Sequence, residues 1–401
     1  MGFMGFIERE AEVCAANYSP LPVVLSEARG VWVTDVHGKR YLDMMSAYSA
    51  VNVGHGHPRI LAAMNRQAAR LAVTSRAYYT DVLGAFLKRL TAIAGLDMAL
   101  PMNTGAEAVE TAIKAARRWG YRHKGIPDGR AEIIVARDNF HGRTTTIVGF
   151  SSDASYRDGF GPFAPGFREV PFGDAEAAEA AITAETCAIL IEPIQGEAGI
   201  VVPPDGYLTR LREICDRAGV LLILDEIQSG LGRTGRWFAH DHEGVRPDGL
   251  ILGKALGGGV YPVSAFLARR EVMSVFGAGS HGSTFGGNAL AAAIGLEALD
   301  VIESEGLIEN SARMGEYFLG QLSAKRSNVV REVRGRGLWA GVDVDPNVAS
   351  AKELCLRLAE EGVLTKDTHE TTLRFAPPLV ITRDEIDWGL DRIRKVFAAA
   401  A

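Results

Sequence analysis

Two short apolar runs each lead to a charged residue, and the two charges have opposite signs. We expect both to lie at one edge of a buried sheet. Val220–Leu224 and Leu250–Leu252 have the length and composition of strands buried on both faces of a parallel sheet. The first run leads directly to Asp225, and the second leads to Lys254. Because ligands of open α/β sheets bind outside the carboxyl ends of the strands, this pair predicts an active-site floor. The alternative is a structural salt bridge between neighbouring strand ends.

A lysine and an aspartate in this arrangement suit pyridoxal phosphate chemistry. A desolvated amine such as that of Lys254 has a lowered pKa and can attack an aldehyde to form a Schiff base. The protonated ring nitrogen of pyridoxal phosphate needs an acidic partner, which Asp225 would provide. From these two residues alone, the cofactor site and the salt bridge both remain open.

Two glycine motifs in the same stretch suggest other ligands. Gly230–Gly235 matches the dinucleotide pattern G-x-G-x-x-G, which would indicate a nicotinamide-dependent oxidoreductase, but it neither follows its strand directly nor opens an obvious helix. Gly249–Ala255 resembles a phosphate-binding P-loop, yet it is one residue short and has Ala255 in place of the hydroxyl that binds magnesium. We therefore regard the first match as weak and exclude the second.

The charge balance and the N-terminus limit the surroundings in which the chain acts. A formal net charge of −6 argues against binding to nucleic acid or to an anionic membrane. No apolar run approaches the roughly 20 residues that span a bilayer. The start, MGFMGFIERE, lacks a secretory signal, and Phe6 breaks the myristoylation pattern. We expect a cytoplasmic protein.

Metal binding and disulfides are not expected. The cysteines are scattered without C-x-x-C spacing; they are Cys14, Cys187, Cys215 and Cys355. His55 and His57 lie in a loop-like stretch without a third ligand close by, so we interpret them as turn residues.

Other polar residues follow predicted strands. After Leu100–Asn103, Thr104 is a good N-cap for a helix running to about Trp119, and the free amides at its start suit a phosphate, although most capped helices bind nothing. Phe140 and Arg143 follow the strand Ala131–Ala136. They could cover a flat ring and bind a carboxylate, or belong to an ordinary loop.

Two later segments add to the same rim. Glu192 and Glu197 follow the strand Ala188–Ile191, and Ser283 and Thr284 lie in a donor-rich turn beyond Val263–Ala268.

From about residue 289 the pattern changes to that of a separate α+β domain. We expect helices near 289–304, 307–325, 350–361 and 383–398, and strands at Val329–Val333, Leu338–Val344 and Leu373–Phe375, the last of which carries Arg374. The resulting division is an N-terminal segment, 1–47, that packs with the small domain, a large domain, 48–288, and a small domain, 289–401.

With these residues placed, the sequence resembles the class III, fold-type I pyridoxal-phosphate aminotransferases along almost its whole length. The matching segments occur in the family's order: NYSPLPVVL, YSAVNVGHGHP, LPMNTGAEAVETAIKAARRWGY, NFHGRT, GFGPF, EPIQGEAG, DEIQSGLGRTG, LGKALGGGVYPVSA, HGSTFGGN and LRFAPPLV. The resemblance implies an α/β fold, with a mainly parallel, helix-flanked sheet in the large domain and a smaller α+β domain.

The resemblance also implies how the cofactor is bound. Lys254 and Asp225 would be catalytic. The cofactor-binding set would be Gly105, Ala106, Phe140, His141, Glu192, Asp225, Gln228, Lys254, Ser283 and Thr284. Ser283 and Thr284 would come from a second subunit, which implies a homodimer with shared active sites and allows a larger oligomer. One departure is His141, because some relatives carry tryptophan there.

For the substrate, the resemblance implies that Tyr18, Tyr48 and Arg143 hold the α-amino and α-carboxylate groups of L-ornithine. Glu197 and Arg374 would exchange partners between the half-reactions. The expected reaction transfers the δ-amino group to 2-oxoglutarate, giving glutamate 5-semialdehyde and glutamate. Relatives acting on acetylornithine or 4-aminobutyrate are the alternatives, and the two tyrosines favour ornithine. The complete lysine–aspartate pair argues against an inactive scaffold.

Overall fold

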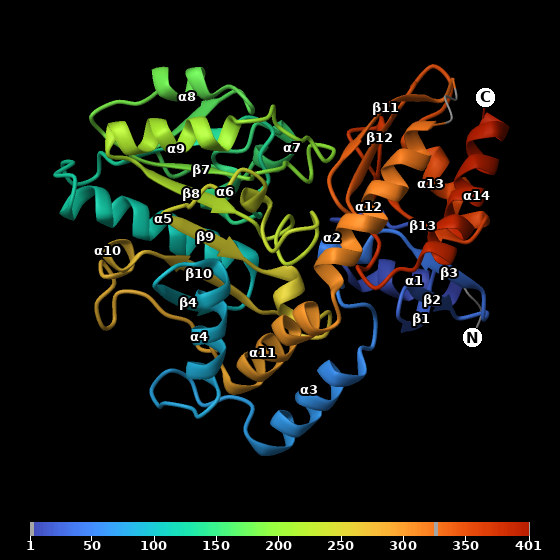
Figure 1. Ribbon diagram of the computed structural model, residues 1–401, viewed down its shortest axis with the longest axis horizontal. Coiled ribbons are helices and arrows are strands. Elements are labelled where there is room, and N and C mark those ends of the chain that lie inside the picture. The colour runs from blue at the N-terminus through green and yellow to red at the C-terminus, as the bar shows by residue number, and fades with distance from the viewer. Residues whose placement is uncertain (1–3, 325–327, 401) are drawn as a thin grey trace.

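The central element of the fold is a seven-stranded sheet, seen in a computed structural model that describes residues 4–324 and 328–400 (Figure 1). In spatial order its strands are β4 (Met98–Met102), β10 (Ser264–Ala268), β9 (Gly249–Leu252), β8 (Leu221–Asp225), β7 (Thr186–Ile191), β5 (Glu132–Ala136) and β6 (Phe167–Val170). Neighbours from β9 to β6 pair in parallel, and only β10 runs antiparallel to both of its neighbours. The predicted mainly parallel α/β sheet is confirmed.

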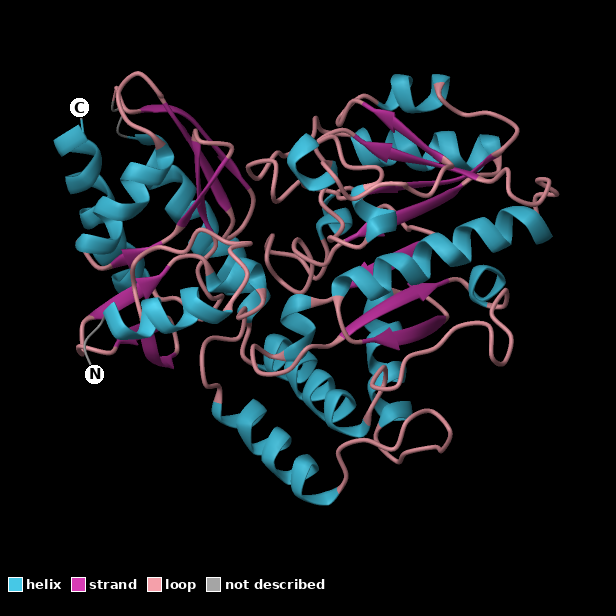
Figure 2. Ribbon diagram, turned by 180° about the vertical axis from the view of Figure 1, so that it is seen from behind, coloured by secondary structure: helices cyan, strands magenta, loops and turns pink. Residues whose placement is uncertain are grey.

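Both faces of this sheet are buried, which explains the unbroken apolar runs in the sequence. In β8, Leu221 and Ile223 pack in one core with α5 (Gly105–Arg122). Leu222 and Leu224 face the opposite core, to which α9 (Tyr207–Ala218) and α11 (Ala289–Ser304) contribute. Figure 2 shows the helices covering the sheet.

A second body contains two four-stranded sheets. One has the order β1 (Leu25–Arg29), β2 (Trp32–Asp35), β3 (Arg40–Asp43), β13 (Val363–Leu364), and the other β11 (Val330–Gly335), β12 (Ala340–Val344), β15 (Thr372–Phe375), β14 (Lys366–Thr368). The parallel pairing of β3 with β13 joins the N-terminal hairpin to the C-terminal part of the chain. Its helices are α1 (Met4–Val13), α12 (Leu307–Ala324), α13 (Ala351–Glu360) and α14 (Arg383–Ala400).

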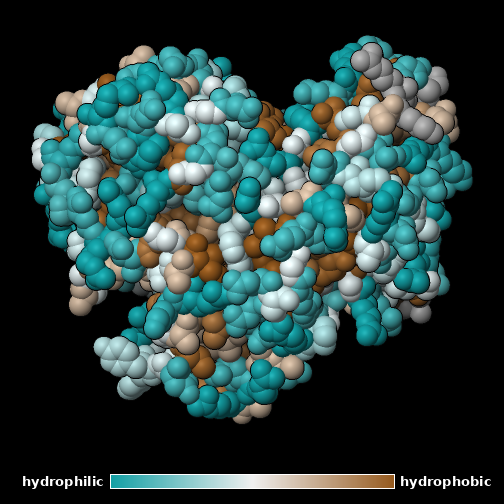
Figure 3. Space-filling view, viewed as in Figure 1, coloured by the Kyte–Doolittle hydropathy of each residue, from teal (hydrophilic) through white to brown (hydrophobic). Residues whose placement is uncertain are grey.

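The three-part domain division stays a prediction. The helix α11, which begins at its second boundary, packs against α3 (Pro58–Arg70) and α4 (Leu83–Ala94) beneath the large sheet. On packing alone, that boundary would therefore move toward the start of α12. Figure 3 shows the surface notched between the two bodies, with hydrophobic side chains visible in the notch.

The remaining elements are short. They are α2 (Ser46–Ser49), α6 (Thr145–Val148), α7 (Ala154–Arg157), α8 (Ala175–Ala180), α10 (Arg270–Met273) and the 3₁₀ turns η1 (Ala239–His242) and η2 (Lys254–Gly257). Within residues 4–324 and 328–400, no helix has both the length and the apolar character that a membrane span requires.

Candidate active site

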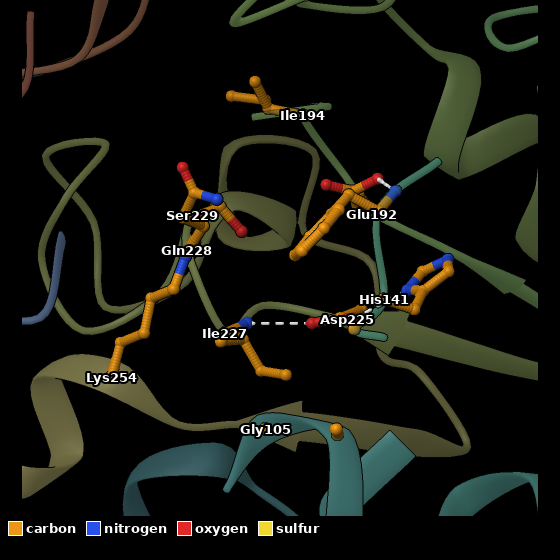
Figure 4. A pocket seen from close by; sticks show the side chains of 12 residues that line it. Gly105, His141, Glu192, Ile194, Asp225, Ile227, Gln228, Ser229 and Lys254 are labelled. Atoms are coloured by element: carbon orange, nitrogen blue, oxygen red, sulfur yellow. Dashed lines mark hydrogen bonds and ion pairs between the residues drawn. The ribbon is translucent and has the colours of Figure 1, made fainter. Parts of the chain in front are cut away.

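The carboxyl ends of the parallel strands converge on a cavity of about 190 Å³. Asp225 ends β8, and Lys254 follows β9 after a single glycine, as the sequence predicted. In Figure 4, Lys254 and Gln228 lie on one side of the cavity, with Asp225 and His141 on the other. The residues that line it are Gly105, Ala106, Phe140, His141, Gly142, Glu192, Ile194, Asp225, Ile227, Gln228, Ser229 and Lys254.

The amine of Lys254 is prepared for nucleophilic chemistry. Desolvation lowers its pKa to about 8, although the nearby carboxylates of Glu197 and Asp225 act in the opposite direction. Its backbone has a positive φ of 44°, an uncommon conformation for a side-chain-bearing residue and one that recurs at functional sites.

Asp225 is fixed by two hydrogen bonds. Its Oδ2 lies 2.7 Å from Nδ1 of the fully buried His141, and its Oδ1 accepts from the Ile227 amide at 3.0 Å. Burial opposes protonation of His141, but the hydrogen bond to Asp225 outweighs it and raises the histidine pKa. This histidine therefore orients the strand-end carboxylate.

Glu192 shapes the wall beside this pair. Its two carboxylate oxygens accept from the Phe140 amide at 3.0 Å and the Gly196 amide at 3.3 Å. Burial raises the pKa of Glu192 to about 7; His141 opposes this shift and Asp225 adds to it. The structure thus gives Glu192 a clear role in holding the backbone at Phe140.

The start of α5 closes the cavity with backbone amides. Thr104 and Glu107 form a capping box, in which the Thr104 hydroxyl accepts from the Glu107 amide and Glu107 accepts from the Thr104 amide at 2.8 Å. The next two amides, of Gly105 and Ala106, occupy the first turn, where N–H groups have no intrahelical partner. They are suitably placed to bind an anion.

Ser283 and Thr284 do not line this cavity. Ser283 accepts a hydrogen bond from the side chain of Asn103 at 2.8 Å, and Thr284 is exposed. The structure therefore does not bring these two predicted cofactor ligands to the cavity of their own chain.

An ion pair lies at the far end of the site. Nη1 of Arg374 lies 2.8 Å from Oε1 of Glu197, which also accepts from Gln228 Nε2 at 3.2 Å. Burial works against the charged form of Glu197, but Arg374 and Lys254 more than compensate and lower its pKa. The ring of Tyr48 lies 5.1 Å from the Arg374 guanidinium and 5.9 Å from the Lys254 amine. The structure thus brings these predicted substrate residues together.

The sequence did not indicate the conformation that presents Tyr48. The short helix α2 (Ser46–Ser49) is left-handed, with φ values of 42°, 47°, 59° and 71°. Such a conformation costs about 1–2 kcal/mol per residue and is otherwise rare in successive non-glycine residues. Asp43 Oδ1 accepts from the Ser46 amide at 2.8 Å, and the Ser46 hydroxyl donates to the Ala376 carbonyl at 2.6 Å. Tertiary contacts therefore hold this turn.

Arg143 and Tyr18 lie further out. The Arg143 guanidinium stacks 4.2 Å from the ring of Tyr156, a residue the sequence did not single out, and 5.8 Å from that of Phe140. Tyr18 is 73% exposed. Neither predicted residue lines the cavity of this chain.

The competing ligand motifs find no support in the geometry. No helix opens after Gly230–Gly235, which forms a series of turns. His55 pairs with Asp43 at 2.7 Å, and within the described part of the chain no three His, Cys, Asp or Glu residues form a group that could hold a metal ion.

Comparison with known proteins agrees with this geometry. A model of the family "Aminotransferase class-III" matches residues 13–397. An ornithine aminotransferase of Brevibacillus brevis is 54% identical over 391 residues, which cover 98% of this chain and 97% of that protein. The crystal structure of the ornithine aminotransferase of Toxoplasma gondii has a TM-score of 0.98 at 43% identity, covering 100% of this chain and 96% of that one. The crystal structure of an acetylornithine aminotransferase of Elizabethkingia anophelis has a TM-score of 0.90 at 44% identity, covering 100% of both chains.

Proposed function

Because the chain belongs to the class III aminotransferase family, we propose that it transfers the δ-amino group of L-ornithine to 2-oxoglutarate, giving glutamate 5-semialdehyde and glutamate. The observation that supports the proposal is a cavity lined by Lys254 and Asp225, with the Glu197–Arg374 ion pair next to it. Glu197 is joined to the cavity wall by its hydrogen bond from Gln228. In the ion pair, Arg374 can be either masked by Glu197 or free to bind a substrate carboxylate. A reaction with two different amino acids needs such a change.

The residues of the cavity fit pyridoxal phosphate. When bound, this group supplies an aldehyde carbon and an electron-withdrawing ring. Asp225, oriented by His141, would hold the ring-nitrogen proton, and Gln228 would contact the ring hydroxyl. The amides of Gly105 and Ala106 would receive the phosphate. Phe140, held through its amide by Glu192, would cover the ring.

Lys254 has two tasks in this proposal. Its amine would hold the cofactor, and when free it would take the proton that leaves the substrate δ-carbon. A lysine with a pKa near 8 suits both tasks, because it can accept and release a proton near neutral pH.

At the far end, Tyr48, Tyr18 and Arg143 would hold the α-amino and α-carboxylate groups of ornithine. Glu197 would mask Arg374 while ornithine is bound, and Arg374 would take the α-carboxylate of 2-oxoglutarate in the second half-reaction. The ion pair of 2.8 Å fits the masked state.

We also propose a cytoplasmic homodimer with shared sites. The exposed Thr284 is followed by the exposed Phe285, and Tyr78 and Tyr79 are exposed on another loop. Large apolar side chains exposed at a surface favour association with another chain. Ser283 and Thr284 would then reach the phosphate in the partner's cavity.

A substrate comparison tests the function. The purified protein should convert ornithine with 2-oxoglutarate at a higher kcat/KM than N-acetylornithine or 4-aminobutyrate. Tyr48→Ile should lower the value for ornithine by roughly tenfold to a hundredfold, as expected when a charged group loses a hydrogen bond. The same change should raise the value for 4-aminobutyrate, which has no α-amine. A wild type that prefers acetylornithine would instead support the activity named for the Elizabethkingia structure.

A further inference from the structure

The guanidinium of Arg233 joins segments that meet beside the cavity, although Arg233 does not line it. Its side chain is 0% exposed. Nη1 donates to the carbonyl oxygens of Leu338 and Pro377 at 2.7 and 2.6 Å. Nη2 donates to the Ser46 hydroxyl at 3.1 Å and to the Asn52 side-chain oxygen at 2.5 Å. One side chain thus links the loop after β8, the N-terminal part of the chain and the second body.

All four acceptors are neutral, so the guanidinium has no carboxylate among its hydrogen-bond partners. Burial lowers its pKa to about 9, although Asp43 acts in the opposite direction. A buried cation remains stable only while its hydrogen bonds are made. The guanidinium therefore requires its acceptors to stay in one arrangement.

Two of these acceptors lie next to substrate-facing residues. Ser46 begins the left-handed turn that carries Tyr48, and Pro377 follows β15, which carries Arg374. The Ser46 hydroxyl, while accepting from Arg233, also donates to the carbonyl of Ala376. The position of Tyr48 beside Arg374 is thereby coupled to the guanidinium.

We infer that Arg233 is a positioning residue for ornithine: it holds the turn Ser46–Ser49 in its left-handed form and so keeps Tyr48 where the substrate's α-amine binds. The inference rests on the proposed function, and it adds a specificity determinant that does not touch the substrate.

The test uses two variants and two substrates. Arg233→Lys keeps the charge but cannot reach all four acceptors, and Ser46→Ala removes the link to the turn. We compare ornithine with 5-aminopentanoate, which is ornithine without the α-amine. Both variants should lower kcat/KM for ornithine by about tenfold or more, mainly through KM. The value for 5-aminopentanoate should stay within about twofold of the wild type. If Arg233→Lys does not fold, Ser46→Ala carries the test.

A second substitution asks whether the turn itself is responsible. Ala47 is exposed and has a φ of 47°. Glycine adopts this conformation without the steric penalty, so Ala47→Gly should make the left-handed turn easier to keep. In the double variant with Ser46→Ala, it should return the KM for ornithine most of the way to the wild-type value.

Ser311→Ala is the matched control. The Ser311 hydroxyl is buried and donates to the backbone carbonyl of Arg233 at 2.9 Å, but it does not touch the guanidinium. Ser311→Ala should lower the midpoint of urea unfolding of the cofactor-free protein. It should leave the ratio of kcat/KM for ornithine to kcat/KM for 5-aminopentanoate unchanged. Cofactor content, measured by absorbance after denaturation, should match the wild type in Ser46→Ala.

The outcomes separate this inference from the proposed function. A wild type that does not turn over ornithine would overturn the proposed function. If the wild type uses ornithine but Ser46→Ala lowers kcat/KM equally for both substrates, or changes it for neither, Arg233 does not position Tyr48. Failure of Ala47→Gly to restore the KM would likewise overturn the role of the turn.

Discussion

At the scale of single residues, the site depends on side chains whose charges are set by their neighbours. Lys254 lies in a desolvated position, Asp225 is oriented by His141, and Glu197 is paired with Arg374. The sequence identified all five of these residues, but it did not predict the hydrogen bond between His141 and Asp225. That contact depends on how the loop after β5 folds over the end of β8.

The pKa of Lys254 predicts how cofactor uptake depends on pH. Because burial lowers this pKa to about 8, the neutral, nucleophilic amine increases as the pH rises through 8. Cofactor-free protein should therefore take up pyridoxal phosphate faster with rising pH, and the rate should level off by about pH 9. The measurement is the growth of visible absorbance, followed by borohydride reduction and peptide mapping to Lys254. A rate still rising at about pH 10 would indicate an unshifted lysine, and Lys254→Arg serves as the control.

The Glu197–Arg374 pair predicts a change of specificity. In Glu197→Ala, Arg374 loses its partner at 2.8 Å and stays available to an α-carboxylate in both half-reactions. Single-turnover experiments should show faster transfer of the α-amine of glutamate and a loss of the preference for ornithine. Glu197→Gln keeps the contact to Gln228 but not the charge. Its preference for ornithine should lie between those of the wild type and Glu197→Ala. Unchanged half-reaction rates in Glu197→Ala would mean that the ion pair is only structural.

At the scale of elements, the helices and strands near the site follow from local patterns. The strand β4 begins at Met98 rather than Leu100, and α5 continues to Arg122 rather than to Trp119. Thr104 is the N-cap that the sequence predicted. Element ends depend on capping and fraying, so shifts of this size are expected.

The capping box predicts a measurable contribution to stability. Thr104→Ala leaves the Glu107 amide without its acceptor and should lower the free energy of unfolding by about 1 kcal/mol. Urea unfolding of the cofactor-free protein measures the change, with Thr104→Ser as a control that keeps the hydroxyl. A wild-type midpoint in Thr104→Ala would show that the cap contributes nothing to this helix.

The left-handed turn Ser46–Ser49 is the element that local patterns do not indicate. A run of side-chain-bearing residues with positive φ is unfavourable on its own and contains no glycine to signal it. Contacts from Asp43, Ala376 and Arg233 hold it in the structure.

At the scale of the whole molecule, the shared site of the proposed homodimer can be tested by complementation. Lys254→Ala removes the reacting amine, and Thr284→Glu places a negative charge where the partner's phosphate would bind. Each variant alone should be inactive. Because a mixed dimer has one site with both residues intact, a refolded equal mixture should recover roughly a quarter of wild-type activity. No recovery in mixtures that light scattering shows to be dimeric would place the whole site within one chain.

The sequence by itself determined the strands that lead to the site and the chemistry at their ends. Continuous apolar runs specify strands buried on both faces, and the residue after such a run, as with Asp225, must emerge at the carboxyl edge of the sheet. Only the tertiary structure decided which groups meet across that edge. The contact of His141 with Asp225, the strained turn beneath Tyr48 and the four hydrogen bonds of Arg233 join segments up to 330 residues apart. No local preference encodes such contacts, because their stability comes from burial and from partners that only folding brings together.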